Sequence, residues 1–216
     1  MYKTQNQPII CNSLYKESSF DDLLITEKLR NSFSSLKKDK YMKNGDNYRY
    51  RAFLQGFYKN NKINWFEKTD FFQSNQINSY QGGITRNFPP VDKEIHNDIE
   101  NLLLELNLLK DDFYIGCHQI RITVDEKNIG CPAPEGFHQD GFDYVMIIAI
   151  AQFNISGGIT LLRKHSSEEI IYKNTLQPYK YLIFKDSLVD HYTTPITHLI
   201  PHYGYRDVLV ITLTKI

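Results

Sequence analysis

The segment IGCHQIRITV at residues 115–124 decides the fold class, because it begins a run of short segments rich in β-branched and apolar residues. Comparable segments follow at 144–155, 159–163, 179–184 and 207–213. Short runs of this kind, separated by turn-forming residues, are typical of antiparallel strands. We therefore expect a mainly β core over residues 113–216, compatible with a sandwich or a barrel.

A glycine pair separates two of these segments. The sequence Asn154-Ile155-Ser156-Gly157-Gly158 lies between the apolar runs 144–155 and 159–163. Glycine adopts positive φ without steric cost, as tight turns require. The sequence therefore predicts a hairpin that joins these two strands.

The upstream part of the chain, residues 1–112, shows a mainly helical pattern. Apolar residues follow Asp21 and Asp22 at helical spacing and end at Lys37 and Lys38, where cations favour a helix C-terminus. A second helix is expected to open at Pro89-Pro90 and to carry one apolar stripe of Ile95, Ile99, Leu102, Leu106 and Leu109. The stripe needs a partner surface, which the sheet supplies. No repeat or linker interrupts the sequence, so one domain over residues 1–216 is expected.

Charge and composition favour a small-molecule partner. The 25 basic and 25 acidic residues cancel, and no basic stripe is interleaved with aromatic residues, which argues against a nucleic-acid partner. The longest apolar run, 145–151, is too short to span a bilayer, and residues 1–10 lack a charged leader followed by an apolar stretch. We expect a cytoplasmic protein with no membrane contact. Its cysteines, Cys11, Cys117 and Cys131, show no C-x-x-C spacing and are expected to be reduced thiols.

The sequence EGFHQDG at residues 135–141 carries a candidate metal site. Residues two apart on an extended strand share a face, so His138 and Asp140 can offer an imidazole and a carboxylate to one point. His191 follows the strand at 179–184 and its turn, so it could come from a neighbouring strand. Two histidines and one carboxylate leave three coordination positions open, as in oxygen-activating ferrous sites. A zinc hydrolase can use the same ligands, so they alone leave the metal open.

Arg206 favours the ferrous interpretation. It begins an alternating strand and shares a face with Val208 and Val210, at a position that can lie deeper in the same pocket. A planar guanidinium there could hold the far carboxylate of a keto-diacid through two parallel hydrogen bonds. The alternative for Arg206 is a surface ion pair at the start of a strand.

Several motifs in order resemble one known family, the iron and 2-oxoglutarate dioxygenases that hydroxylate free amino acids, such as bacterial L-isoleucine 4-hydroxylase. The resemblance runs from about Tyr48 to the C-terminus and is only loose before it. It is carried by Tyr48-Arg49-Tyr50-Arg51, Gln81-Gly82-Gly83-Ile84-Thr85-Arg86, His118-Gln119-Ile120-Arg121, Pro132-x-Pro134-Glu135-Gly136-x-His138-x-Asp140-Gly141, Asn154-x-x-Gly157-Gly158 and Arg206-Asp207-Val208-Leu209-Val210.

The resemblance implies an α+β fold with a mainly β core: a distorted double-stranded β-helix (jelly roll, cupin-like) backed by N-terminal helices. It implies His138, Asp140 and His191 as ligands of Fe(II) and Arg206 as the residue that holds 2-oxoglutarate. With O2, these would hydroxylate a C–H bond of a free L-amino acid and release succinate and CO2. Related halogenases lack the carboxylate ligand, so the presence of Asp140 favours hydroxylation.

Four residues are candidates for substrate binding, each with a structural alternative. Arg121 could bind a substrate carboxylate or form a structural ion pair. Glu135 could accept the substrate ammonium or be a solvated loop carboxylate. Arg86 could close over the site or lie on a surface loop, and Asp143, with Tyr144 beside it, could line the pocket or be an ordinary strand residue.

Two other functions stay open at this point. One is the same chemistry on a peptide-bound or carrier-bound residue, and the other is a jelly-roll module that binds metal without turnover. The sequence alone leaves open which amino acid and which carbon react, the stereochemistry and the oligomeric state.

Overall fold

A seven-stranded antiparallel sheet is the larger layer of the protein. The computed structural model describes residues 13–43, 46–60, 62–67, 70–106 and 112–216. The strand order in this sheet is β1-β11-β7-β14-β6-β2-β3. Its members are β1 (Tyr15–Ser19), β2 (Arg49–Lys59), β3 (Lys62–Trp65), β6 (Phe113–Val124), β7 (Tyr144–Phe153), β11 (Lys180–Lys185) and β14 (Gly204–Lys215).

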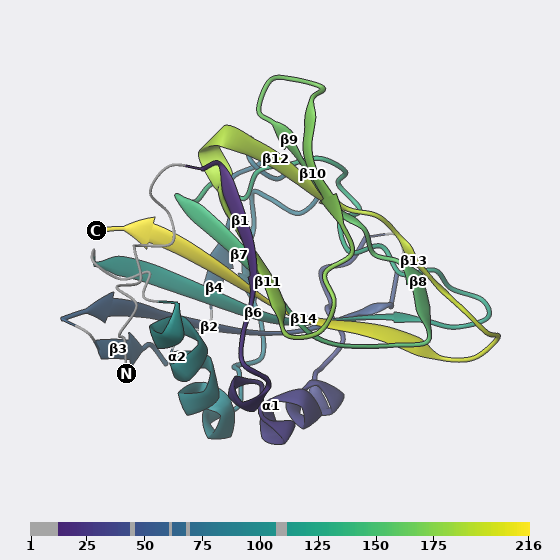
Figure 1. Ribbon diagram of the computed structural model, residues 1–216, viewed down its shortest axis with the longest axis horizontal. Helices are drawn as coiled ribbons and strands as arrows, with labels where there is room; N and C mark the ends of the chain where they lie inside the picture. The colour runs from purple at the N-terminus through teal and green to yellow at the C-terminus, as the bar shows by residue number, and fades with distance from the viewer. Residues whose placement is uncertain (1–12, 44–45, 61, 68–69, 107–111) are drawn as a thin grey trace, which may run out of the picture.

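Smaller sheets complete the β structure. The order β10-β9-β12 forms a three-stranded sheet, and β8 pairs with β13 and β4 with β5. In Figure 1, β9, β10 and β12 lie across the larger sheet from α1 and α2. Two facing antiparallel layers form the jelly roll that the sequence predicts. The strands of the smaller sheets are β4 (Asp70–Phe72), β5 (Thr85–Asn87), β8 (Ile155–Gly157), β9 (Thr160–Lys164), β10 (Ile170–Asn174), β12 (Val189–Thr193) and β13 (Ile196–His198).

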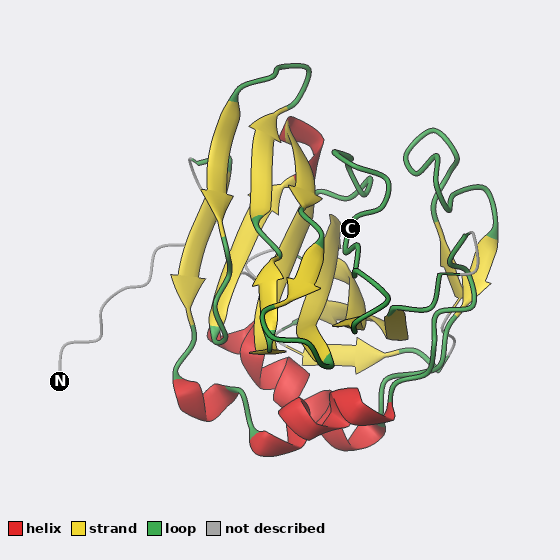
Figure 2. Cartoon of the chain, turned by 90° about the vertical axis from the view of Figure 1, so that its right-hand side faces the viewer, coloured by secondary structure: helices red, strands yellow, loops and turns green. Residues whose placement is uncertain are grey.

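Two short helices cover the outer face of the larger sheet (Figure 2). They are α1 (Glu27–Ser32) and α2 (His96–Glu105), with 3-10 turns η1 (Asp22–Leu24), η2 (Phe33–Ser35), η3 (Lys93–Ile95) and, before β12, η4 (Asp186–Leu188). Their buried leucines and isoleucines share one hydrophobic core with the outer-facing residues of β2, β6 and β14. Within the described residues, no helix is long and apolar enough to cross a membrane. The helices thus support the sheet from outside and leave its inner face for a site.

The prediction that residues 1–112 are mainly helical is wrong. Strands β1 to β5 all lie in this part of the chain, and the helix expected between Asp21 and Lys38 is reduced to α1 with flanking 3-10 turns. Strand β2 is buried on both faces along much of its length, which erases the polar–apolar alternation that identifies a strand. The second helix begins later than Pro89-Pro90, at η3 and α2. Its stripe from Ile95 to Leu106, the residue that caps α2, is buried, whereas Leu109 falls outside the described residues.

The predicted hairpin at residues 154–158 is also wrong. Strand β7 pairs with β11 and β14, whereas β9 pairs with β10 and β12 in the opposite layer. Gly157 and Gly158 have φ values of 87° and 66°, and a side chain on Gly157 would collide with the backbone oxygen of Pro195. The glycine pair therefore carries the chain between layers.

Two of the cysteines are described, and both are free thiols. Cys117 on β6 is buried, and Cys131 is partly exposed. Cys11 lies outside the described residues.

Candidate metal centre

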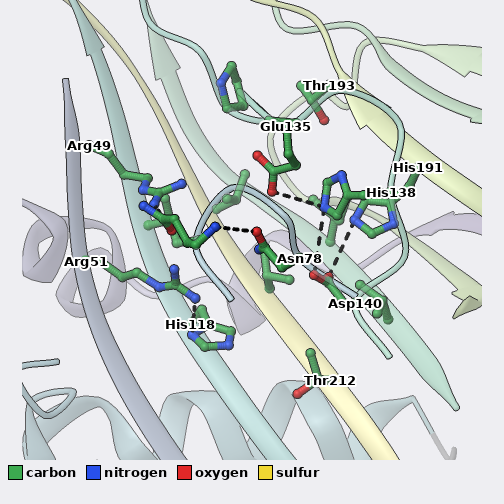
Figure 3. A pocket seen from close by; sticks show the side chains of 18 of the residues that line it. Arg49, Arg51, Asn78, His118, Glu135, His138, Asp140, His191, Thr193 and Thr212 are labelled. Carbon is green, nitrogen blue, oxygen red and sulfur yellow. Dashed lines mark hydrogen bonds and ion pairs between the residues drawn. The ribbon is translucent and has the colours of Figure 1, made fainter. Parts of the chain in front are cut away.

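Two chain segments meet at the candidate metal site. His138 and Asp140 lie in the loop before β7, and His191 lies on β12. The backbone N–H of His138 donates to the carbonyl of His191 at 3.1 Å, and the N–H of His191 donates to the carbonyl of His138 at 2.8 Å. This single antiparallel bridge sets the two imidazoles side by side, with ring centroids 4.1 Å apart (Figure 3).

The three side chains offer their ligand atoms to one point. Asp140 Oδ2 lies 3.5 Å from His191 Nε2, and Asp140 Oδ1 lies 3.8 Å from His138 Nε2. All three ligand atoms fall within 4.8 Å of one another. Atoms bound to one cation at roughly 2.1 Å lie about 3–4 Å apart. The arrangement fits a metal held by two histidines and a carboxylate.

Hydrogen bonding fixes which nitrogen of His138 is free for a metal. Its Nδ1 lies 2.8 Å from the carbonyl oxygen of Gly136, which can only accept, so Nδ1 carries the proton and donates. In the neutral imidazole Nε2 then carries the lone pair, and it points toward Asp140. Nδ1 of His191 lies 3.7 Å from Oδ1 of Asp186. A backbone carbonyl outside the ligand set therefore orients the ring of His138, whereas Nδ1 of His191 faces the Asp186 carboxylate without a hydrogen-bond partner among the described residues.

Asp186 holds the turn that carries Asp140. Its Oδ2 accepts the backbone N–H groups of Asp140, Gly141 and Phe142 at 2.9, 2.6 and 3.1 Å. The side chain is fully buried, and burial raises its pKa. We class Asp186 as a positioning residue that sequence reasoning missed, because no spacing links it to the metal motif.

The electrostatics keep Asp140 ionised. Burial raises the pKa of its carboxyl, but the neighbouring His191 and His138 outweigh burial and hold the pKa well below its usual value. For His191, burial lowers the pKa, but the adjacent Asp140 and other carboxylates outweigh burial, so the pKa lies above its ordinary value. A partly buried carboxylate that stays ionised beside two imidazoles suits the binding of a cation.

Arg206 lies on the inner face of β14, where the sequence predicts it. Its side chain is buried, and Nη2 has no hydrogen-bond partner among the described residues. Burial lowers the pKa of its guanidinium to about 10, with Asp207 opposing the shift. Val208 and Val210 line the same cavity. The surface ion-pair alternative is therefore wrong, and a buried donor without a partner fits the distant carboxylate of a keto-diacid.

A cavity of about 110 Å³ joins these groups. One part of its wall is apolar, formed by Ile120, Ile122, Phe142, Val145, Ile147, Val208 and Val210. The other part is polar, formed by Arg49, Arg51, Gln73, Asn78, Gln81, Arg86, His118, Glu135 and Thr193 beside the three metal-site residues. At roughly 10–15 Å³ for each water molecule, the space is sized for small molecules.

Two of the four substrate candidates line the cavity. Glu135 places Oε1 3.4 Å from Nε2 of His138, and its Oε2 is buried without a hydrogen-bond partner among the described residues. Arg86 is 1% exposed, not on a surface loop. It donates from Nη1 to Gln81 and from Nη2 to Gln73.

The other two candidates lie outside the cavity. Ile120 and Ile122 face the cavity, so Arg121 between them faces away, and it forms a bidentate pair with Asp207 at 2.7 Å. The structural ion pair, the alternative for Arg121, is therefore correct. Asp143 is exposed and accepts the backbone N–H of Lys215 at 2.8 Å, and its neighbour Tyr144 packs against the hydrophobic core.

Further polar residues of the cavity went unassigned in the sequence. Arg49 and Arg51 lie two apart on β2 and both face the cavity, where His118 on β6 joins them (Figure 3). Their spacing is the signal that would have found them, once residues 49–59 were identified as a strand. Gln73, Asn78 and Gln81 lie in a loop and give no such signal.

Comparison with known proteins agrees with this geometry. A family model described as 2OG-Fe dioxygenase matches residues 30–212. A bsmA homolog from Methylobium petroleophilum PM1 has a similar structure, with a TM-score of 0.77 and 29% identity over 89% of this chain and 82% of that chain. No curated protein sequence matches the chain.

Two solved structures of lower identity support the fold alone. IDO from Bacillus thuringiensis is 19% identical, with a TM-score of 0.74 over 94% of this chain and 90% of that chain. TqaL, an Fe(II)/(alpha)ketoglutarate-dependent dioxygenase, is 15% identical, with a TM-score of 0.68 over 94% and 83%. With the family model covering most of its length and a His-Asp-His site in place, the chain belongs to the 2OG-Fe dioxygenase family, whose cofactors are Fe(II) and 2-oxoglutarate.

Proposed function

We propose that this dioxygenase hydroxylates an unactivated C–H bond of a free L-amino acid with an aliphatic side chain, and that 2-oxoglutarate is converted to succinate and CO2. The cavity that adjoins the metal-site residues is small, and its wall combines an apolar part with charged groups of both signs. An amino acid in its zwitterionic form presents the matching set of an ammonium, a carboxylate and an apolar side chain. Asp140 occupies the carboxylate position of the metal site, which favours hydroxylation over halogenation.

Glu135 carries this proposal. Its buried Oε2 lacks a hydrogen-bond partner among the described residues, and a buried carboxylate oxygen in that state costs free energy. The carboxylate lines the cavity, next to His138. An ammonium group from a substrate would satisfy this oxygen and would hold the rest of the molecule close to the metal ligands.

The protein's own contribution is to bind and to orient. His138, Asp140 and His191 would hold Fe(II), and Arg206 would hold the far carboxylate of 2-oxoglutarate. When both are bound, Fe(II) and 2-oxoglutarate supply the oxidising chemistry together with O2. The buried walls keep the substrate in one orientation and exclude water, and this selects one C–H bond among several of similar reactivity.

A panel of the twenty common L-amino acids tests the proposal through succinate release under air with Fe(II) and 2-oxoglutarate. We expect one amino acid, or a few of similar shape, to stimulate succinate release and to yield a hydroxylated product. His138→Ala should abolish the stimulation, and Glu135→Gln should raise KM for the amino acid by about 10-fold or more, because a charged hydrogen bond contributes about 1.5–3 kcal/mol.

Two results would contradict the proposal. If no free amino acid stimulates succinate release while a peptide-bound or carrier-bound residue does, the chemistry stands and the substrate is tethered. If Fe(II) binds but no substrate of any kind leads to consumption of 2-oxoglutarate, the protein is a metal-binding module without turnover.

A further inference from the structure

Arg51 and Arg86 form a pair of buried cations that line the same cavity as the metal-site residues, and Figure 3 shows Arg51 on the side away from His138 and His191. Their guanidinium groups contact the same two aromatic rings. The guanidinium carbon of Arg51 lies 4.4 Å from the ring centroid of Phe88 and 5.5 Å from that of Phe71. The guanidinium carbon of Arg86 lies 4.8 Å from the ring centroid of Phe71 and 6.0 Å from that of Phe88. The two rings hold both charges against the cavity without neutralising them.

Both guanidinium groups keep an unsatisfied donor. The Nε atoms of Arg51 and Arg86 are buried and have no hydrogen-bond partner among the described residues. The other contacts of the pair are to neutral groups: Arg51 donates to Nδ1 of His118 at 2.8 Å, and Arg86 donates to two glutamine oxygens. Within the described chain, neither arginine has a carboxylate within 4.0 Å.

Arg49 lines the same cavity but, unlike Arg51 and Arg86, is paired with a carboxylate of the protein. It lies two residues before Arg51 on β2. Its Nε donates to the buried carboxylate of Asp39 at 2.8 Å, and its Nη2 donates to Gln81. The fold thus supplies an acid to one arginine of this wall and leaves the other two for an anion from outside.

The electrostatics agree with this contrast. Burial, and next the neighbouring Arg49, lower the pKa of Arg51 to about 9, and burial lowers the pKa of Arg86 as well. His118 offers no compensating charge, because burial and Arg51 hold its pKa well below the ordinary value and keep it neutral. Buried cations in this state are stabilised when an anion pairs with them.

We propose that Arg51 and Arg86 together receive the free carboxylate of the substrate, so that the enzyme acts only on molecules whose carboxylate is uncapped. This rests on the proposed function, in which Glu135 takes the ammonium and Arg206 takes 2-oxoglutarate. It also predicts that an amide or ester in place of the carboxylate, as in a peptide-bound or carrier-bound residue, is excluded.

Titration calorimetry under anaerobic conditions, with Fe(II) and 2-oxoglutarate bound, tests the subsite apart from turnover. The probes are 3-methylbutanoate and 3-methylbutanamide, which share one shape and lack an amine. We expect the acid to bind about 10-fold or more tightly than the amide. Arg51→Lys keeps the charge but loses the planar guanidinium. It should weaken binding of the acid by about 10- to 100-fold and leave 2-oxoglutarate binding unchanged.

Arg121→Lys is the matched control, because Arg121 pairs with Asp207 on the other face of β6 and should affect neither probe. Equal binding of acid and amide, or no binding of either, would overturn the subsite. An Arg51→Lys variant with weaker binding of 2-oxoglutarate and unchanged binding of the acid would also overturn the subsite, since the two arginines would then hold the co-substrate. If Arg51→Lys does not fold, the acid and amide comparison in the wild-type protein decides.

The two proposals fail separately. Selective binding of the acid without hydroxylation of any free amino acid would leave the subsite standing and refute the proposed function. Hydroxylation of a free amino acid with the same KM in wild type and Arg51→Lys would do the reverse.

Discussion

The two polar walls of the cavity carry groups that suit ligands of opposite charge. The metal wall, formed by Glu135, His138, Asp140 and His191, gathers carboxylates and imidazoles and is suited to a cation. The arginine wall, formed by Arg49, Arg51 and Arg86, gathers guanidinium groups that donate to glutamine oxygens or, for Arg51, to His118, and only Arg49 has a carboxylate partner among the described residues. A cavity with one wall for a cation and another for an anion can bind a metal and a zwitterion together.

The walls also differ in how the chain builds them. The metal wall comes from the seven-residue stretch 135–141 of the loop before β7 and from strand β12, joined by the backbone bridge between His138 and His191. The arginine wall comes from β2 and β5, and its hydrogen-bond partners come from β6 and from the loop that holds Gln73 and Gln81. A short motif can therefore identify the first wall, whereas the second becomes visible only when the strands are placed side by side.

Removing a metal ligand should give the largest effect. Asp140→Ala takes away the only anionic member of the three-residue site, so we expect the rate of substrate-stimulated succinate release to fall by more than about 100-fold, beyond the 10- to 100-fold typical of groups behind the ligands. Steady-state assays at saturating Fe(II) measure this fall. A variant that retains most of its activity would show that the metal wall is not where the reaction occurs.

Arg206 should have the next largest effect, and it should act on the co-substrate alone. Arg206→Gln removes the charged fork while it keeps a polar side chain, so KM for 2-oxoglutarate should rise by about 10- to 100-fold. KM for the substrate should change little, in contrast to Arg51→Lys. A rise in KM for the substrate instead would exchange the roles of Arg206 and the arginine wall.

A substitution of Asp186 tests whether the metal wall depends on the hydrogen bonds that hold the turn of Asp140. Asp186→Asn keeps the size of the side chain but removes the charge that accepts three backbone N–H groups. We expect a loss of about 1–3 kcal/mol in the free energy of unfolding, which corresponds to a fall in Tm of about 2–12 °C, together with weaker Fe(II) binding. Thermal unfolding and metal titration, each compared with Ser187→Ala on the exposed side of the same turn, measure the two effects. Unchanged Fe(II) affinity would contradict a positioning role for Asp186.

The outer face of β14 gives the smallest effect on activity and a defined effect of pH on stability. Burial raises the pKa of Asp207 to about 6, and Arg121 lowers it in part. A raised pKa means that the folded state binds the proton more tightly than the unfolded state does. The stabilisation is therefore complete below pH about 4 and is lost as pH rises to about 6.

Asp207→Asn should remove this pH dependence. Urea unfolding at several pH values between about 4 and 7 measures the difference in stability between wild type and variant. The difference should shift in favour of the variant as pH rises through this window and then stay constant. A constant difference from the start would show that the folded-state pKa of Asp207 is not raised.

The sequence was most informative where local pattern and chemistry coincide. The strand segments that became β6, β7, β9, β11 and β14 followed from alternation and spacing, whereas the jelly-roll arrangement followed from the resemblance to a known family. The meeting of His138, Asp140 and His191 depended on a pairing between distant segments, which the motif suggested and the bridge explains.

Each prediction that differs from the structure has its own physical reason. Strand β2 is buried on both faces, so its apolar pattern did not distinguish it from a helix, and the arginines it carries were left without a role. The sequence places Arg121 on a predicted strand without showing which face it takes, and alternation along β6 turns it to the opposite face from Ile120 and Ile122. The sequence predicts a local hairpin at Gly157 and Gly158, whereas the chain there passes from β7 in the larger sheet to β9 in the smaller one.

The most direct test of the metal wall is an anaerobic Fe(II) titration of the wild type, Asp140→Ala and Glu135→Ala, followed by calorimetry. We predict one site per chain in the wild type, affinity lowered by about 100-fold or more in Asp140→Ala, and affinity almost unchanged in Glu135→Ala, whose carboxylate is reserved for the substrate. Equal Fe(II) affinity in wild type and Asp140→Ala, or loss of binding in Glu135→Ala alone, would contradict the assignment of the ligands.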